Sequence, residues 1–177
     1  LLKVIICVYL GCLLHAVVVY GSLLKFIGGY SPIKFFKNVL PAQLVAFSTC
    51  SSSATLPVSM ECVQKMGVSK EISSFVLPLG ATINMNVTTI YKKNYTLFVA
   101  QIYGIDLTSA QMMTIILTGT LASIGTAGVP GAGLIMLTMV LQSVGLPLEG
   151  VALVAGIDRV LDMPRTTVNI TGDAVVA

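Results

Sequence analysis

A run of charged and amide side chains at residues 157–173 lies between apolar stretches and constrains the fold more than any other feature. Its polar residues recur every three or four positions, at Asp158, Asp162, Thr166, Asn169 and Asp173. This spacing places them on one face of a helix, with Arg165 as a neighbour. Ionisable residues in an apolar setting usually face a cavity and carry a function. The run therefore predicts one wall of a solute or ion site.

The surrounding sequence is that of an integral membrane protein. Lysine, arginine, aspartate and glutamate make up 10% of the 177 residues, whereas about 25% is usual in a soluble domain. Several apolar runs reach the roughly 20 residues that cross a bilayer; they are Val4–Leu24, Phe75–Tyr103 and Ala110–Leu146. We expect a multi-pass protein in the lipid bilayer of the cell inner (plasma) membrane.

Other protein classes have little support in the sequence. The four cysteines show no CxxC spacing, so neither a disulfide nor a cysteine metal site is expected. The net charge is +3, and the scattered lysines are not interleaved with aromatic residues, so no nucleic-acid partner is expected. The chain starts without methionine and ends inside an apolar run. We expect it to be part of a longer protein.

The same arrangement of helices and breaks occurs twice. A first helix, up to about Leu24, precedes both copies. The first copy has the helical segments Ile33–Thr49, Val58–Met66, Ser69–Thr82 and Val87–Tyr103, with breaks at Cys50–Pro57 and Ile83–Asn86. The second has Thr108–Ala122, Leu134–Val144 and Leu148–Ala177, with a glycine-rich break at Ser123–Gly133. Broken apolar segments at matching places in two halves are the best sequence indication of a secondary-transporter site.

The predicted fold is therefore an all-α membrane protein with an inverted repeat of a re-entrant helical hairpin plus a transmembrane helix. One transmembrane helix and its cytoplasmic loop, residues 1–32, precede the repeat. Residues 33–104 form the first hairpin and a broken helix, and residues 105–177 form the second hairpin and the final helix. Five lysines fall on the side expected to be cytoplasmic, which agrees with the positive-inside rule; they are Lys25, Lys34, Lys37, Lys65 and Lys70.

Four segments resemble the dicarboxylate/amino acid:cation symporter (glutamate transporter) family. They are Ser51–Pro57, Leu77–Met85, Ala122–Gly133 and Asp158–Asp173, in the order that the family has them. The resemblance covers essentially the whole chain and implies the C-terminal transport domain, without the N-terminal helices that form the family's trimer scaffold. It implies no enzyme and no cofactor. The implied activity is secondary active symport of glutamate or aspartate with sodium or a proton, by an elevator-type mechanism in a homotrimer.

The resemblance also implies the substrate-binding residues. Asp162 would accept the substrate ammonium and Arg165 would hold its side-chain carboxylate, which a planar guanidinium binds through two parallel hydrogen bonds. The hairpin tips and neighbouring helices would supply the rest, namely Ser51, Ser52, Ser53, Thr88, Val129, Gly133, Thr166 and Asn169. Because an amino group needs a carboxylate partner, Asp162 favours an amino acid over a plain dicarboxylate such as succinate.

Two sets of cation ligands follow from the same resemblance. One consists of Gly80, Asn84, Asn169 and Asp173, and the other of Thr82 with the carbonyls of Ser123, Ile124 and Thr126. A third cation position falls on Asn86, where the family usually has an acidic residue and this chain has an amide. Val87 replaces a glycine at the expected unwound point, where a β-branched residue resists positive φ. Lys92 and Lys93 place two ammonium groups in a helix that is usually apolar, each costing about 2.5–3.5 kcal/mol at a membrane centre.

Alternatives remain open from the sequence. The same residues could serve a C4-dicarboxylate symporter, and the changes at Asn86–Lys93 could mark a transport-inactive fragment with a degraded cation site. An intramembrane hydrolase using a serine of residues 51–53 has less support. Such a serine needs a base, and the only histidine, His15, lies in a different helix.

Overall fold

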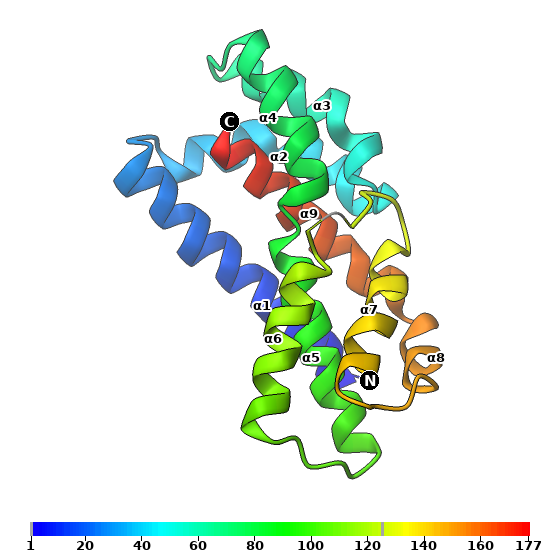
Figure 1. Cartoon of the computed structure of the whole chain (residues 1–177). Coiled ribbons are helices and arrows are strands. Elements are labelled where there is room, and N and C mark those ends of the chain that lie inside the picture. Colours follow the sequence, from blue (N-terminus) through cyan, green and yellow to red (C-terminus); the bar gives the residue numbers. More distant parts are fainter. Residues whose placement is uncertain (1, 125) are drawn as a thin grey trace.

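The computed structural model describes residues 2–124 and 126–177, with the side chain of Asn86 outside the described part. All regular structure in these residues is helical, and the described part contains no strand (Figure 1). This confirms the all-α prediction.

The N-terminal half begins with one long helix. It starts as α1 (Leu2–Leu14) and continues through the π-helical segments η1 (His15–Tyr20) and η2 (Leu23–Ile27). The following elements are α2 (Pro32–Thr49), α3 (Ser52–Lys65), α4 (Lys70–Ile83) and α5 (Asn86–Ile102). Within the described residues, Leu2–Ile27 is the helix that is long and apolar enough, by length and composition, to cross a membrane.

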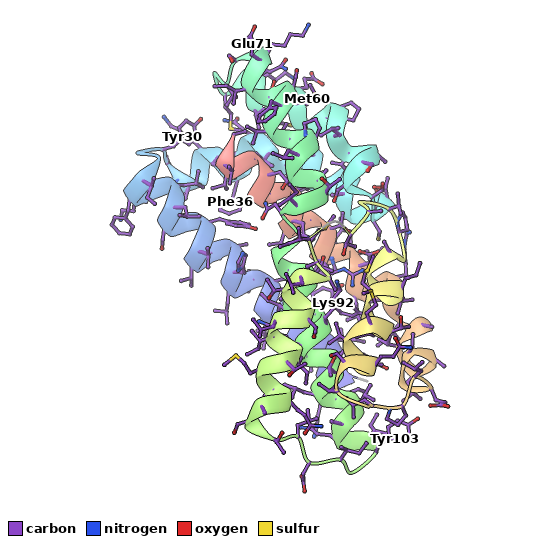
Figure 2. All side chains as sticks on the ribbon, in the orientation of Figure 1. Tyr30, Phe36, Met60, Glu71, Lys92 and Tyr103 are labelled. Carbon is purple, nitrogen blue, oxygen red and sulfur yellow. The ribbon has the colours of Figure 1, made fainter. Side chains whose placement is uncertain are left out.

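The described residues of the C-terminal half are also helical in their regular structure. Its elements are α6 (Ser109–Leu121), α7 (Ala132–Ser143), α8 (Gly150–Ala155) and α9 (Asp158–Val176). The turn between α3 and α4 lies at one end of the molecule, and the loop between α5 and α6 lies at the opposite end (Figure 1). Figure 2 marks these two ends by Glu71 and Tyr103.

Local sequence explains several helix boundaries. The side chains of Ser51, Ser69 and Thr108 each accept a hydrogen bond from a backbone N–H in the first turn of α3, α4 and α6. Side-chain oxygens at this position satisfy N–H groups that a helix leaves without partners. Helix α2 ends at Cys50, whose φ of 55° is left-handed, a common way to end a helix.

Helix α9 lies at the centre of the structure. It packs against α1, α2, α3, α4 and α5, and Figure 1 shows it crossing between the two halves. One apolar core gathers around α5, α7 and α1, and another around α2, α3 and α4; α9 contributes to both, through Leu161 and Val168 in the first and Ile170 and Ala174 in the second. The polar run predicted to form a site wall is therefore surrounded by protein.

The structure corrects three of the predicted elements. The final segment is not one helix from Leu148, because it breaks near Gly156, a residue of low helix propensity, before α9 starts at Asp158. The first hairpin break is shorter than Cys50–Pro57, because α3 already begins at Ser52. The second break is shorter than Ile83–Asn86, because α4 reaches Ile83 and α5 begins at Asn86, which leaves Asn84 and Met85 between them. Val87 is not among the described residues with positive φ.

Candidate functional site

Helix α9 presents the predicted polar face to the protein interior. All six residues of that face are buried: Asp158, Asp162, Arg165, Thr166, Asn169 and Asp173. Pro164, within the helix, lacks an N–H and cannot bond the carbonyl of Val160 four residues earlier. That carbonyl instead accepts a hydrogen bond of 3.0 Å from the hydroxyl of Tyr9 on α1, so the proline is accommodated by a neighbouring helix.

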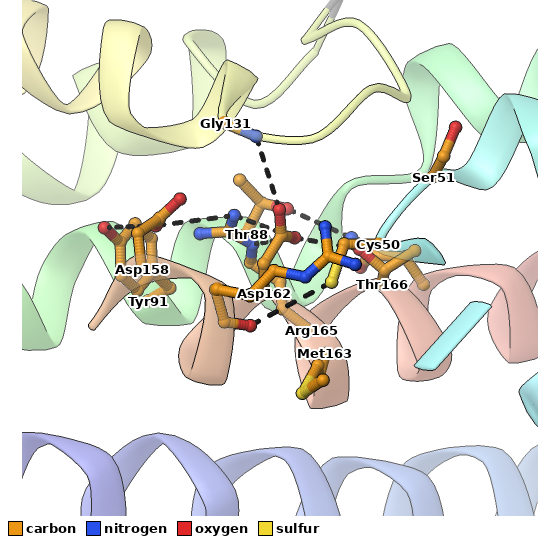
Figure 3. Close-up of polar contacts among 12 residues, drawn as sticks. Cys50, Ser51, Thr88, Tyr91, Gly131, Asp158, Asp162, Met163, Arg165 and Thr166 are labelled. Atoms are coloured by element: carbon orange, nitrogen blue, oxygen red, sulfur yellow. Dashed lines mark hydrogen bonds and ion pairs between the residues drawn. The ribbon is translucent and has the colours of Figure 1, made fainter. Parts of the chain in front are cut away.

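Asp162 and Arg165 form a buried ion pair at the centre of this face (Figure 3). Arg165 Nη2 lies 2.9 Å from Asp162 Oδ1, and Arg165 Nε donates to the same oxygen at 3.2 Å. Thr166 Oγ1 also donates to it, at 2.8 Å. The side chains of the ion pair are 3% and 6% exposed. The apolar protein interior strengthens the attraction within such a pair. Removing one partner is destabilising, because it leaves the other charge buried and unpaired.

Tyr91 and Asp158 complete the surroundings of the guanidinium. Arg165 Cζ lies 4.3 Å from the centre of the Tyr91 ring, and its Nη2 lies 3.9 Å from Asp158 Oδ1. The Tyr91 hydroxyl donates to Asp158 Oδ1 at 3.3 Å. Arg165 Nη1 is buried and has no hydrogen-bond partner among the described residues. A buried N–H donor without a partner is costly, so Nη1 is available to an anionic or carbonyl oxygen.

The two loops that interrupt the helices meet over this pair. Ser51 Oγ donates to the carbonyl of Gly128 at 2.9 Å, and the backbone N–H of Ser53 donates to the same oxygen at 3.1 Å. From the second loop, the N–H of Gly131 donates to Asp162 Oδ2 at 3.4 Å (Figure 3). The loops after α2 and α6, far apart in sequence, therefore enclose the acidic and basic groups of α9.

The enclosed space is small and polar. Its lining residues come from the two loops, from α5 and from α9: Cys50, Ser52, Met85, Thr88, Thr126, Ala127, Gly128, Val129, Gly133, Asp162, Arg165, Thr166 and Asn169. About 20 Å³ is left between them, enough for one water molecule. A Cβ on Gly133 would lie 2.8 Å from Arg165 Nη1 and Nη2. A glycine at this position therefore leaves room for the guanidinium to lie against the backbone of α7.

The predicted substrate residues fall into two groups in the structure. Eight of the ten line the enclosed space: Ser52, Thr88, Val129, Gly133, Asp162, Arg165, Thr166 and Asn169. Ser51 is buried but its hydroxyl is used in the contact with Gly128. Ser53 is exposed and approaches the same carbonyl through its backbone N–H. These two serines join the loops.

Asn169 links α9 to the interruption before α5. Its Oδ1 accepts a hydrogen bond of 3.1 Å from the N–H of Val87, and its Nδ2 donates to Thr88 Oγ1 at 3.0 Å. The Met85 sulfur lies 3.2 Å from the same Nδ2. The amide therefore satisfies a backbone N–H that the first turn of α5 leaves without a helical partner.

Three residues of the first predicted cation set lie together. Asn84 Nδ2 donates to Asp173 Oδ1 at 2.8 Å, and a Cβ on Gly80 would lie 2.5 Å from that oxygen. Asp173 is 4% exposed, and among the described residues no lysine or arginine nitrogen lies within 4.0 Å of its carboxylate. A buried carboxylate without a cationic side chain suits a hard cation, which prefers oxygen ligands. Asn169, the fourth member, faces Met85 and Thr88.

The members of the second predicted cation set differ in burial. Ser123 and Thr126 are buried, but Ile124 is 53% exposed. Thr82 is also exposed and donates to Leu79 O within its own helix at 2.9 Å. No hydrogen bond between described residues joins Thr82 to the segment after α6. The third predicted position, the side chain of Asn86, lies outside the described part of the chain.

Sequence reasoning missed Tyr91 and Gly128 as parts of this site. Tyr91 lies seven residues before Phe98, on a face of α5 that is otherwise apolar. The pattern of polar residues therefore gave no indication that its ring packs against Arg165. Gly128 acts through its backbone carbonyl, which no residue type reveals. Asp158, at the start of the predicted polar face, contacts Arg165 in the structure.

Comparison with known proteins places the chain among membrane transporters. The model of the sodium:dicarboxylate symporter family matches residues 1–177. Excitatory amino acid transporter 1 of Rattus norvegicus is 44% identical over 171 residues, which are 96% of this chain and 32% of that protein. Excitatory amino acid transporter 5 of Homo sapiens is 43% identical over 168 residues, 94% of this chain and 30% of that protein. An excitatory amino acid transporter of Caenorhabditis elegans is 45% identical over 148 residues, which are 83% of this chain and 29% of that protein.

The chain thus spans about a third of the length of the curated relatives it matches.

Proposed function

We propose that this chain, which belongs to the sodium:dicarboxylate symporter family, forms the part of a symporter that binds an acidic amino acid together with sodium. The family is one of transporters and not of enzymes. The relatives are named as excitatory amino acid transporters, which supports glutamate or aspartate as the transported solute and sodium as the coupling ion.

The observation that carries the proposal is the buried pair of Asp162 and Arg165, with Arg165 Nη1 still able to donate. An acidic amino acid has the complementary groups. Its ammonium would take Asp162, with Thr166 as a neighbour, and its side-chain carboxylate would take the guanidinium. Without a substrate, Asp162 and Arg165 neutralise each other's charge, with 2.9 Å between Asp162 Oδ1 and Arg165 Nη2. A substrate must therefore supply both charges at once, which favours an amino acid over succinate.

Entry of such a substrate requires the loops to separate. The space of about 20 Å³ is too small for an amino acid, and the loops are joined through Ser51, Ser53 and the carbonyl of Gly128. We propose that residues 126–133 act as the lid and move away from residues 50–53. Loop motions of this kind commonly control access to a site.

The finer architecture belongs to the same proposal. We assign residues 33–104 and 105–177 to two re-entrant hairpins, each followed by a helix, in an inverted repeat after the helix of residues 1–32. Irregular backbone at membrane depth is tolerated where it lines a cavity, and the breaks at Cys50 and at Ala127–Val129 adjoin the enclosed space. An elevator-type movement in a plasma-membrane homotrimer would then carry the site across the bilayer.

Sodium-dependent binding of radiolabelled aspartate to the purified protein tests the function. We expect saturable binding in sodium chloride and at least tenfold weaker binding in choline chloride, because the ion and the solute share the site around α9. Glutamate should compete, and succinate should compete weakly because it lacks an ammonium group for Asp162. Aspartate binding that depends on pH and does not require sodium would indicate proton coupling instead. The absence of binding under all these conditions would contradict the proposal.

Asp173→Asn tests the first cation position, at which Gly80 and Asn84 lie beside the carboxylate. The change removes the negative charge but keeps the size of the side chain. We expect the sodium concentration for half-maximal aspartate binding to rise at least tenfold, since charge on a hard-cation ligand contributes strongly to affinity. Binding at saturating sodium should be largely retained. An Asp106→Asn control in the exposed loop after α5 should leave the sodium dependence unchanged, and an unchanged Asp173→Asn variant would remove this residue from the site.

A further inference from the structure

Lys92 is a completely buried lysine, although its neighbour Lys93 is only half-buried. It lies on α5 at the middle of the molecule, between the ends marked by Glu71 and Tyr103 (Figure 2). Among the described residues no carboxylate oxygen lies within 4.0 Å of its Nζ. An ionisable side chain at this depth is costly unless its surroundings compensate for lost water, so its contacts decide what it does.

Three oxygens of one short segment surround the Lys92 nitrogen. Nζ donates to the carbonyl of Ala122 at 2.9 Å, to Ser123 Oγ at 3.3 Å and to Thr126 Oγ1 at 3.5 Å. Ala122 follows the last residue of α6, and the C-terminus of a helix carries a partial negative charge that favours a cation. The oxygens therefore replace the hydration of a positive group.

The hydrogens of the neighbouring hydroxyls are already directed elsewhere. Ser123 Oγ donates to Gly119 O at 2.7 Å, and Thr126 Oγ1 donates to Ala122 O at 2.6 Å. Thr89 Oγ1 in turn donates to Ser123 Oγ at 2.8 Å. Both hydroxyl oxygens are thus left as acceptors toward Lys92. An ammonium group has three N–H donors and no acceptor, which matches the three oxygens.

Two of these contacts fall on residues of the second predicted cation set, Ser123 and Thr126. Hard cations such as sodium also bind several uncharged oxygens, so Lys92 and a free cation would compete for one segment of the chain. A second positive charge placed beside a buried ammonium is repelled strongly because the interior screens charge poorly. The other two members of that set, Thr82 and Ile124, are exposed residues.

We propose that the ammonium of Lys92 is a tethered cation that takes the place of a free sodium ion at Ala122, Ser123 and Thr126. Transport by this chain then uses one fewer sodium ion at the lid segment. Sodium at Asp173 remains the dissociable ion of the site. The inference rests on the proposed sodium-coupled function, and its test counts bound ions so that the two can fail separately.

The test is equilibrium binding of ²²Na⁺ to the purified full chain and to Lys92→Gln, with Lys93→Gln as the matched control. Glutamine removes the charge and adds an oxygen, so Lys92→Gln should bind one more sodium ion per protein than the wild type. The Hill coefficient for sodium in aspartate binding should rise by about one. Lys93→Gln should bind the same number of ions as the wild type. An unchanged ion count in a Lys92→Gln protein that still binds aspartate would overturn the proposal.

A second variant covers the case in which Lys92→Gln does not fold. Lys92→Met removes the charge and keeps a long unbranched side chain in the buried position. If the ammonium holds the position, Lys92→Met should also bind one more sodium ion per protein than the wild type. An unchanged ion count in a Lys92→Met protein that still binds aspartate would overturn the inference. Absence of sodium-dependent aspartate binding in the wild type would count against the proposed function alone, since an added ion in Lys92→Gln would still support the tethered cation.

Discussion

Replacing Arg165 with cysteine is expected to abolish binding of aspartate and glutamate. The guanidinium is the only cationic group that lines the enclosed space within the described residues, and charge-assisted hydrogen bonds to a carboxylate contribute about 1.5–3 kcal/mol each. Losing two such bonds lowers the affinity by about two to four orders of magnitude. Competition against radiolabelled aspartate in saturating sodium measures the loss. Small neutral amino acids should bind the variant better than the wild type, because Asp162 still accepts an ammonium.

Arg159→Cys is the matched control for this change. Arg159 lies on the same helix but points away from the site, where its Nη2 and Nη1 donate to Ser48 O at 2.6 Å and Thr49 O at 3.4 Å. Its guanidinium interacts with the C-terminal carbonyls of α2. The change to cysteine should therefore lower the stability of the protein by about 1 kcal/mol, without loss of substrate selectivity. Unchanged aspartate affinity in Arg165→Cys would mean that the substrate carboxylate binds elsewhere.

Asp162→Asn is expected to have the second largest effect, and it acts on folding as well as on binding. The amide leaves Arg165 buried with only Asp158 as a negative neighbour, at 3.9 Å. Breaking a buried pair by removing one partner typically destabilises a protein by about 3–5 kcal/mol. The melting temperature of the detergent-solubilised protein should fall by several degrees, and aspartate binding should be lost because its ammonium has no carboxylate partner.

Comparison with Asp158→Asn separates these two effects. Asp158 is also buried, but it lies farther from the guanidinium than Asp162 does, and it accepts from the Tyr91 hydroxyl. We expect a smaller loss of melting temperature and retention of aspartate binding within about tenfold. Equal loss of binding in both variants would show that the site needs the summed negative charge and not a specific contact to Asp162.

Much of this fold could be predicted because its signals are local. The 3.6-residue period of polar groups from Asp158 to Asp173 predicts one helical face, and the structure buries that face as expected. Pro32, Gly67 and the glycine-rich segment after Ser123 mark breaks that depend on the backbone of single residues. The start of α9 at Asp158 was missed, because a helix can break near one glycine without any change in the apolar pattern.

Contacts between distant segments could not be predicted in the same way. The sequence by itself determined an all-helical membrane chain, the polar face of α9 and the residues able to hold charge. Only the tertiary structure decided that the Gly128 carbonyl joins the loops, that Tyr91 lies under Arg165, and that Lys92 reaches the end of α6. The physical reason is that periodicity reports which side of a helix is polar. The partner of a buried charge depends on how helices far apart in the chain pack against each other.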